Sequence, residues 1–129
     1  AGVLHLDLVE ACADALACAR RNVTDARADF HWADATAFRP ARPADWVVCN
    51  PPFHAGRDAD PALGEGFLRA AARMLAPQGS LWLVANRHLP YDRTLASLFR
   101  TVDVIGGEPA FRLTRSAQPL PARLPPRIP

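Results

Sequence analysis

Short apolar segments typical of strands alternate along this chain with segments of helical periodicity, and this alternation restricts the fold more than any other feature. Strands are expected at 3–9, 28–32, 45–49, 80–85, 101–105 and 110–114. Helices are expected at 11–22, 61–76 and 91–100. Pro77, Gln78 and Gly79 should separate the second helix from the strand that follows. Strands that are joined through helices pair in parallel, so the sequence predicts an α/β fold with a mostly parallel sheet.

The length of the chain suits one small domain. Half of its 129 residues are hydrophobic, which is enough for a packed core. No apolar run approaches the roughly 20 residues that span a bilayer, and no signal peptide is visible, so we expect no membrane partner and a cytoplasmic location. The net charge of +2 falls short of the strongly basic surface of a dedicated nucleic-acid binder.

Three polar residues each follow a strand-like segment, namely Glu10, Asp34 and Asn50. Ligands bind at the carboxyl ends of parallel strands, so we expect these three side chains to line one cleft. A carboxylate in the position of Glu10 can accept hydrogen bonds from the two hydroxyls of a nucleoside ribose, or it can be a solvated strand end. Asp34, with Ala35 beside it, suits an adenine amino group, although Asp is also common in turns.

The run Asn50, Pro51, Pro52 and Phe53 is the strongest functional signal. The two prolines fix the backbone, so the Asn50 side-chain oxygen and the Pro51 carbonyl can act as paired acceptors for a substrate NH2 group. An amide or nucleobase nitrogen is a poor nucleophile, and two acceptors favour the pyramidal geometry of its transition state. Phe53 can stack on a flat base in line with a methyl donor. The alternative is a Pro-rich turn with a core Phe.

The histidines and cysteines give weaker signals. His54 and His88 have no identifiable acid–base partner, so we favour substrate contact or a surface position for both. The three cysteines form no zinc spacing, and we expect them to be buried and inert and the chain to hold no metal: Cys12, Cys18 and Cys49.

Every basic residue of the chain is Arg. Guanidinium groups suit phosphate recognition, but they also occur on solvated helix faces. Among those that follow the Asn50 site, five are candidates for contacts to an RNA backbone: Arg57, Arg69, Arg73, Arg87 and Arg93.

Two segments resemble a known family. They read DWVVCNPPFHAG at 45–56 and VANRHLPY at 84–91. From Val3 to Ala117 the chain resembles the ribosomal RNA guanine-N2 methyltransferases of the small-subunit methyltransferase C type. Several amino-methyltransferase families share NPPF, at 50–53 of the first segment, whereas the second segment is narrower and carries the assignment.

The resemblance implies a Rossmann-like sheet, mostly parallel with a last antiparallel strand, and S-adenosylmethionine as cofactor. The implied reaction transfers a methyl group to the exocyclic N2 amine of a guanine in ribosomal RNA, with that RNA or a ribosomal subunit as partner. The catalytic residues implied are Asn50, Pro51, Pro52 and Phe53. The cofactor-binding residues implied are Glu10, Asp34, Ala35 and Asn50. The catalytic domain then covers 1–117, and an irregular Pro-rich tail covers 118–129.

The family's first strand, its Gly-rich loop and its amino-terminal partner domain would all precede Ala1. We therefore expect an amino-terminally truncated domain. In such a domain the strands that carry Glu10 and Asn50 lack a ladder partner on one side, and the chain alone is inactive.

Two other functions compete with this one. A protein glutamine-N5 or DNA adenine-N6 methyltransferase uses a similar motif, but Phe53, His54 and the segment 84–91 speak against it. A non-catalytic remnant would explain the absent Gly-rich loop. A nicotinamide-dependent oxidoreductase is disfavoured because the chain has no GxGxxG.

Overall fold

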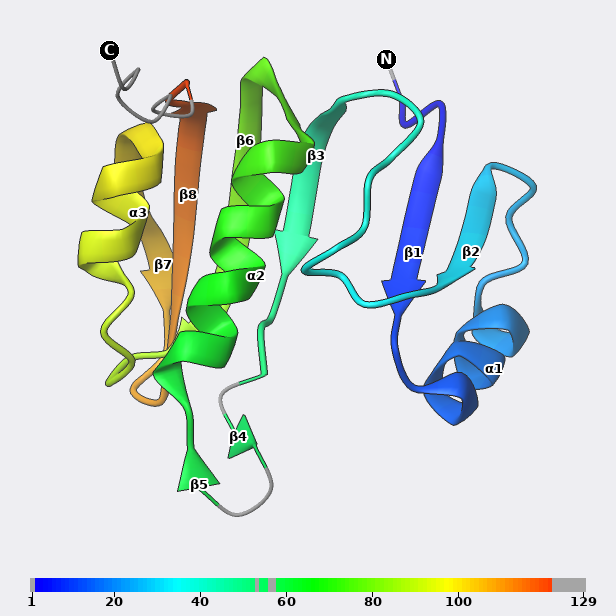
Figure 1. Ribbon diagram of the computed structural model, residues 1–129, viewed down its shortest axis with the longest axis horizontal. Helices are drawn as coiled ribbons and strands as arrows, with labels where there is room; N and C mark the ends of the chain where they lie inside the picture. The colour runs from blue at the N-terminus through cyan, green and yellow to red at the C-terminus, as the bar shows by residue number, and fades with distance from the viewer. Residues whose placement is uncertain (1, 53, 56–57, 122–129) are drawn as a thin grey trace, which may run out of the picture. The chain divides into compact units, whose positions relative to one another are not determined.

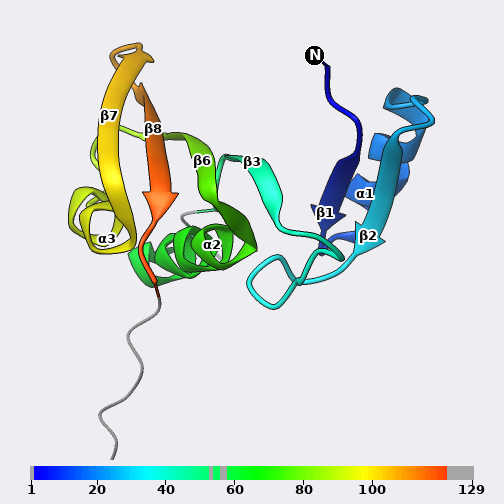
Figure 2. The same cartoon turned by 90° about the horizontal axis from the view of Figure 1, so that it is seen from above.

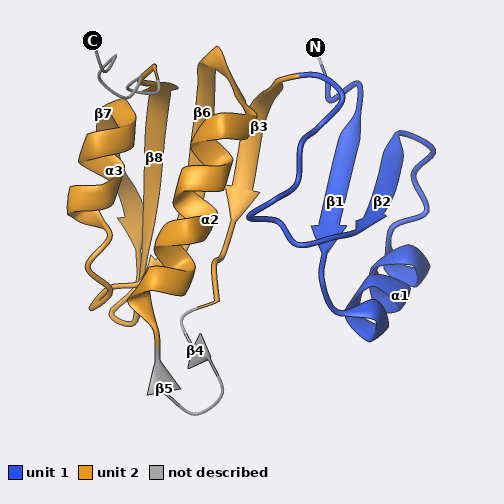
Figure 3. Ribbon diagram, in the orientation of Figure 1, with its two compact units in different colours: residues 1–42 blue, residues 43–129 orange. Residues whose placement is uncertain are grey.

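The computed structural model describes residues 2–52, 54–55 and 58–121, and of 54–55 and 58–59 only the backbone. The chain forms two compact units, Ala1–Arg42 and Pro43–Pro129, which are described separately below (Figure 3). No helix among the described residues is long and apolar enough to cross a membrane.

Unit 1 is a parallel strand pair with one helix (Figure 1). Its elements are β1 (Leu6–Glu10), α1 (Ala13–Asn22) and β2 (Ala28–Trp32). Leu6 lies opposite Ala28 and Glu10 lies opposite Trp32 in the register. Helix α1 packs on the strand face that carries Phe30, because Leu16 is buried and the Arg20 guanidinium lies 5.2 Å from the centroid of the Phe30 ring. The opposite face of the pair carries Asp7, Asp29 and His31.

Unit 2 contains a four-stranded sheet in the order β3-β6-β8-β7. Its elements are β3 (Ala44–Cys49), β4 (His54–Ala55), β5 (Asp58–Ala59), α2 (Pro61–Met74), β6 (Leu75–Asn86), α3 (Asp92–Leu98), β7 (Phe99–Gly107) and β8 (Phe111–Pro119). Strands β3 and β6 are parallel, whereas β8 is antiparallel to both β6 and β7. Helices α2 and α3 lie on the same face of this sheet (Figure 2).

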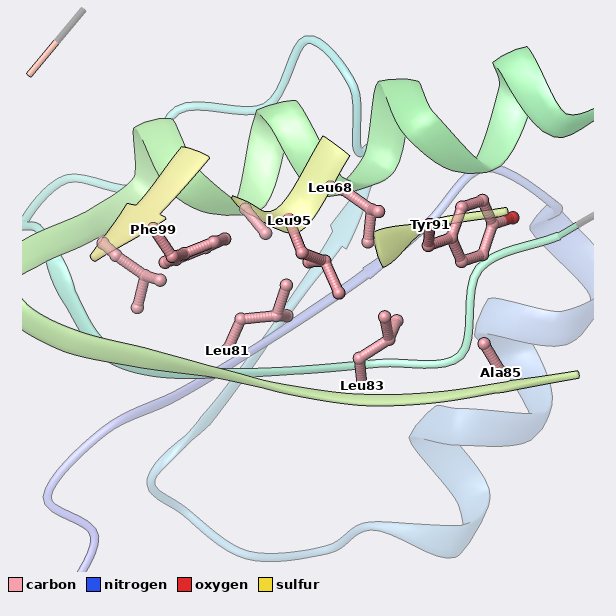
Figure 4. Packing of buried hydrophobic residues seen from close by; sticks show 9 residues of the cluster. Leu68, Leu81, Leu83, Ala85, Tyr91, Leu95 and Phe99 are labelled. Carbon is pink, nitrogen blue, oxygen red and sulfur yellow. The ribbon is translucent and has the colours of Figure 1, made fainter. Parts of the chain in front are cut away.

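The core of unit 2 lies between these two helices and the sheet (Figure 4). Leu68 from α2 and Leu95 from α3 are fully buried against Leu81 and Leu83 of β6. The other sheet face exposes large apolar side chains on β3: Trp46 and Val48 are 66% and 77% exposed, and the Trp46 and Trp82 rings are in tilted contact. Residues therefore alternate along β3, with Val47 packed against the core and its two neighbours facing away from it.

The structure confirms the α/β class, the parallel pairs and an antiparallel last strand. Among the described residues β1 pairs only with β2, and β3 pairs only with β6. Each of these two strands therefore has an unpaired edge, as expected for the strands that carry Glu10 and Asn50.

The element boundaries differ from the prediction mainly around 75–79. Helix α2 ends at Met74, and β6 begins at Leu75. Its pairing with β3 is irregular there, because Ala44 pairs with Leu75 and Trp46 with Ser80, so Pro77 and Gly79 lie within β6 but between these pairs. Gly79 allows this because a Cβ there would lie only 3.0 Å from the Ala44 carbonyl oxygen of the neighbouring strand. At the other end of the unit, β8 continues through Gln118 and Pro119, residues that we assigned to the tail.

The expectation of buried thiols is wrong for Cys12 and Cys18, which are both exposed, whereas Cys49 is partly buried. The reason lies in the orientation of α1. Only Leu16 of this helix is buried. Cys18 lies two positions later and so projects from nearly the opposite side of the helix.

Candidate active site

Glu10 is the last residue of β1, and its carboxylate turns toward the start of α1. Its Oε1 atom accepts a hydrogen bond from the Cys12 backbone N–H at 3.2 Å, which holds the side chain in place. The other carboxylate oxygen has no hydrogen-bond partner among the described residues. The Glu10 carbonyl accepts from Ala33 N–H at 3.1 Å and so extends the ladder toward Asp34.

Asp34 follows β2 and closes a tight turn. Its Oδ1 atom accepts from both the backbone N–H and the hydroxyl of Thr36, at 2.9 and 2.7 Å. These two hydrogen bonds from Thr36, the hydroxyl first, lower the pKa of the Asp34 carboxyl. As in Glu10, one carboxylate oxygen fixes the side chain and the second has no hydrogen-bond partner in the described part of the chain. Ala35 lies in the same turn, where its carbonyl accepts from Phe38 N–H at 3.4 Å.

Trp32 is a neighbour of Glu10 that sequence reasoning treated only as part of a strand. It is the register partner of Glu10 and is 70% exposed. Its indole N–H donates to the Ala11 carbonyl at 2.9 Å, which ties the end of β2 to the turn after β1. The sequence feature that could have drawn attention to Trp32 is a large aromatic residue at the end of a predicted strand.

Asn50 directly follows β3 in unit 2. Its side chain is exposed and makes no hydrogen bond with any described residue. Pro51 is buried and Pro52 is exposed, so the run is anchored through its first proline. Phe53 lies outside the described residues. After it, the backbone of β4 pairs with that of β5, and Asp60 then caps α2 by accepting from Ala62 N–H at 3.1 Å.

The segment 84–91 comprises the end of β6 and the connection to α3, and it is held by local hydrogen bonds. The Asn86 side-chain oxygen accepts from His88 N–H at 3.0 Å, and the Asn86 carbonyl accepts from Leu89 N–H at 3.0 Å. His88 itself is exposed. Tyr91 ends the segment with its ring fully buried, and its hydroxyl has no partner among the described residues. Burial raises the pKa of Tyr91, with smaller contributions from Cys49 and Glu65.

The structure separates the arginines that we considered for RNA contact. Arg87 donates to the Glu108 carbonyl at 2.8 and 3.2 Å, so its guanidinium is occupied within unit 2. Arg69 and Arg93 border a pocket of about 690 Å³ between α2 and α3, together with Glu65 and Asp92. Arg57 lies outside the described residues. Arg73 already interacts with another part of the chain, so it is not a free cation.

Glu10, Asp34 and Ala35 thus belong to unit 1, whereas Asn50, Pro51 and Pro52 belong to unit 2. Within unit 1 the structure places Glu10 and Asp34 at the carboxyl ends of two adjacent parallel strands, as predicted. That Asn50 shares a cleft with them stays a prediction.

Curated relatives are ribosomal RNA methyltransferases. Ribosomal RNA large subunit methyltransferase G of Ectopseudomonas mendocina (strain ymp) is 34% identical over 118 residues, covering 88% of this chain and 32% of the relative. The protein of the same name from Streptomyces coelicolor is 34% identical over 109 residues, covering 84% of this chain and 29% of the relative. The chain spans about a third of the length of these relatives.

Solved structures share the fold. The T. thermophilus 16S rRNA N2 methyltransferase RsmC, in complex with AdoMet and guanosine, superposes with a TM-score of 0.72 at 22% identity, covering 88% of this chain and 31% of that one. The N-methyltransferase NodS from Bradyrhizobium japonicum WM9 has a TM-score of 0.67 at 16% identity, covering 90% of this chain and 74% of that one. These similarities confirm the Rossmann-like methyltransferase fold.

The family described as "Methyltransferase small domain" matches residues 1–115, nearly the whole chain. On this match, and with the fold in agreement, the chain belongs to the methyltransferase small domain family.

Proposed function

We propose that this chain carries catalytic residues of an S-adenosylmethionine-dependent enzyme that methylates the exocyclic N2 amine of a guanine in ribosomal RNA. The proposal rests on the exposure of the Asn50 side chain and on its free hydrogen-bonding capacity within the described part of the chain. Its amide is exposed directly after β3 and makes no hydrogen bond with the described residues, and the buried Pro51 anchors the backbone beside it. An amide oxygen placed in this way is available to accept a hydrogen bond from a substrate amine.

The two carboxylates of unit 1 fit the nucleoside part of the cofactor. Glu10 and Asp34 each use one oxygen to fix the side chain through a backbone N–H, and each keeps the other oxygen for a ligand. In the proposal Glu10 accepts from the ribose hydroxyls, and Asp34, with Ala35 beside it, faces the adenine amino group. Asp34 is exposed and Glu10 is only half-buried, so a ligand can reach both side chains.

The bound cofactor supplies an electrophilic methyl group on a positively charged sulfur. The chain's own residues position the acceptor. The Asn50 side-chain oxygen and the Pro51 carbonyl take the two amine hydrogens, and Phe53 stacks on the base. The nitrogen lone pair then forms the N–C bond as the C–S bond breaks, and the surplus proton of the methylated amine leaves to water.

The substrate follows from what is known of similar proteins. The curated relatives are named as ribosomal RNA methyltransferases, and the RsmC structure contains guanosine. These names support ribosomal RNA as the partner and guanine N2 as the acceptor. The pocket beside Arg69 and Arg93 offers two guanidinium groups for contact with the RNA backbone.

The test is methyl transfer by the longest natural polypeptide that contains this chain. Purified enzyme, labelled S-adenosylmethionine and unmodified ribosomal RNA should yield N2-methylguanosine, identified by mass spectrometry of the digested RNA. Asn50→Ala should lower the single-turnover rate by about 10²–10³, because an acceptor that acts in the transition state is lost. Its cofactor affinity should change little, because Asn50 is proposed to act mainly on the substrate amine. The matched control, Asn22→Ala at the end of α1, should keep the full rate. Methylation of adenine or of a protein glutamine instead, or a normal rate for Asn50→Ala, would overturn the proposal.

A further inference from the structure

Two imidazoles and two carboxylates lie together on the face of the β1–β2 pair that is turned away from α1. The His5 Nε2 atom lies 3.0 Å from Asp7 Oδ1 and 3.5 Å from Asp29 Oδ2. These three side chains can each offer one ligand atom, and the atoms all lie within 4.8 Å of one another. The His31 Nε2 atom lies 2.7 Å from the same Asp7 oxygen. We call these four residues the His–Asp cluster.

The cluster brings like charges together. Asp7 and Asp29 are direct register partners in the parallel pair, so their carboxylates project from the same face at adjacent positions. Like charges directly opposite each other on neighbouring strands are destabilising. A cation held between the two carboxylates would remove this repulsion, and two carboxylates match the charge of a divalent ion.

The backbone on either side of His5 is held by hydrogen bonds to Arg27. The chain before β1 is tied to residue 27, because Leu6 N–H donates to the Arg27 carbonyl at 3.0 Å and the Arg27 guanidinium donates to the Val3 carbonyl at 2.6 Å. Asp25 holds that guanidinium in an ion pair at 2.7 Å. His5 is therefore positioned by contacts on both sides.

We propose that His5, Asp7 and Asp29 bind one divalent first-row transition-metal ion, with Zn²⁺ as the reference ion. Ligand bonds of about 2.0–2.1 Å in a tetrahedron place neighbouring ligand atoms about 3.3 Å apart. The two separations from His5 Nε2, 3.0 and 3.5 Å, fall on either side of this value, and all three ligand atoms lie within 4.8 Å of one another. One imidazole with two carboxylates is a donor set that such ions accept, and water completes the coordination.

His31 acts as a positioning residue in this site. Its Nε2–H donates to Asp7, and its ring packs on Phe38 with the centroids 4.7 Å apart. A hydrogen bond of this kind orients a ligating carboxylate. The ion would join the segment before β1 to β2 and so stabilise unit 1 through mass action, because the unfolded chain does not assemble the ligands.

The spacing of the cysteines gave no indication of this site. The ligands of the His–Asp cluster come from the segment before β1, from β1 and from β2, and only the parallel register places Asp29 beside Asp7.

Calorimetric titration of the whole chain with ZnCl2 tests the proposal. The exposed Cys12 and Cys18 are first replaced by Ser so that thiolates do not compete for the ion. We expect one saturable site, a rise in melting temperature with ZnCl2, and roughly tenfold or greater weakening in both His5→Gln and Asp29→Asn. His31→Gln should weaken binding less than either of them. His88→Gln, an exposed histidine of unit 2, is the matched control and should bind normally.

Far-UV circular dichroism identifies any variant that fails to fold. Asp29 is exposed, so Asp29→Asn is the variant that keeps the test valid if His5→Gln unfolds. Absence of saturable binding up to about 100 μM Zn²⁺, or equal affinity in Asp29→Asn and the parent, would overturn the site. Loss of binding in His88→Gln would place the ion elsewhere and overturn it too. None of these outcomes depends on methyl transfer, so the site and the proposed function fail separately.

Discussion

The Tyr91 hydroxyl lies so close to the backbone of Gly64 that a Cβ added at Gly64 would come within 1.7 Å of the hydroxyl oxygen. This contact joins α2 to the end of the segment 84–91, which carries the family resemblance. Both residues are buried. Glycine in a helix normally costs about 1 kcal/mol relative to Ala, so its presence at this position indicates that close packing outweighs helix propensity.

We therefore predict that Gly64→Ala destabilises unit 2 by about 1–3 kcal/mol, because Tyr91 has to move out of a filled core. The free energy of unfolding from urea titration measures the effect. Gly106→Ala is the matched control: its nearest neighbour would be Leu113 Cδ2 at 3.9 Å, an ordinary contact, so its stability should change by less than about 0.5 kcal/mol. A stabilised Gly64→Ala variant would show that helix propensity prevails and that the contact is loose.

Arg87 is predicted to act through stability rather than through RNA. Its guanidinium donates to the Glu108 carbonyl at the turn between β7 and β8. Arg87→Ala removes these donors and should lower the free energy of unfolding by about 1 kcal/mol. Arg93→Ala, an exposed arginine of α3, should leave stability unchanged and weaken RNA binding instead, measured as a smaller salt dependence of the dissociation constant. Equal losses of unfolding free energy in Arg87→Ala and Arg93→Ala would contradict the assignment of Arg87 to stability and Arg93 to RNA binding.

The three thiols should differ in reactivity. Burial raises the pKa of Cys49 to about 11, whereas Cys12 and Cys18 are exposed. Only the thiolate reacts, so at pH 8 iodoacetamide should modify Cys12 and Cys18 much faster than Cys49. Peptide mass spectrometry over time identifies each modified residue. Fast modification of Cys49 in the folded chain would show that the end of β3 is open to reagent.

The same shift predicts a loss of stability in alkali. The folded pKa of Cys49 lies above the unfolded value, so the folded state favours the protonated thiol. The contribution of the protonated Cys49 thiol to the free energy of unfolding is complete at pH values below the pKa of the unfolded chain, and it is lost as the pH rises toward 11. Chemical unfolding between pH 8 and pH 11 should therefore show a decline that Cys49→Ala reduces. An unchanged decline in Cys49→Ala would assign the effect to other groups.

Glu10 should control cofactor affinity in the longest natural polypeptide that contains this chain. Glu10→Gln keeps an oxygen that can accept from Cys12 N–H but removes the negative charge offered to the ribose. We expect the dissociation constant for S-adenosylmethionine to rise about 10-fold to 100-fold, since hydrogen bonds to charged groups contribute about 1.5–3 kcal/mol. Calorimetry measures it, with Glu65→Gln on α2 as the control. Unchanged affinity would remove Glu10 from the cofactor site.

Local sequence signals were sufficient wherever a single segment decides the outcome. Strand 28–32 and the start of α2 at Pro61 were predicted as observed. The positions of Glu10 and Asn50 at strand ends were also readable, because a strand of apolar residues has to stop where polar residues or prolines begin.

Tertiary structure decided everything that depends on which segments lie side by side. The pairing of Ala44 with Leu75 drew 75–79 into β6, although Pro77 and Gly79 suggest a break when considered alone. The Glu108 carbonyl, in the turn between β7 and β8, accepts hydrogen bonds from the Arg87 guanidinium. The buried Tyr91 ring fits beside α2 only because residue 64 is a glycine. The register of β1 with β2 assembled the His–Asp cluster. Propensity and capping act within a few residues and can be read along the chain, whereas strand register and side-chain packing join residues far apart in sequence and exist only once the chain has folded.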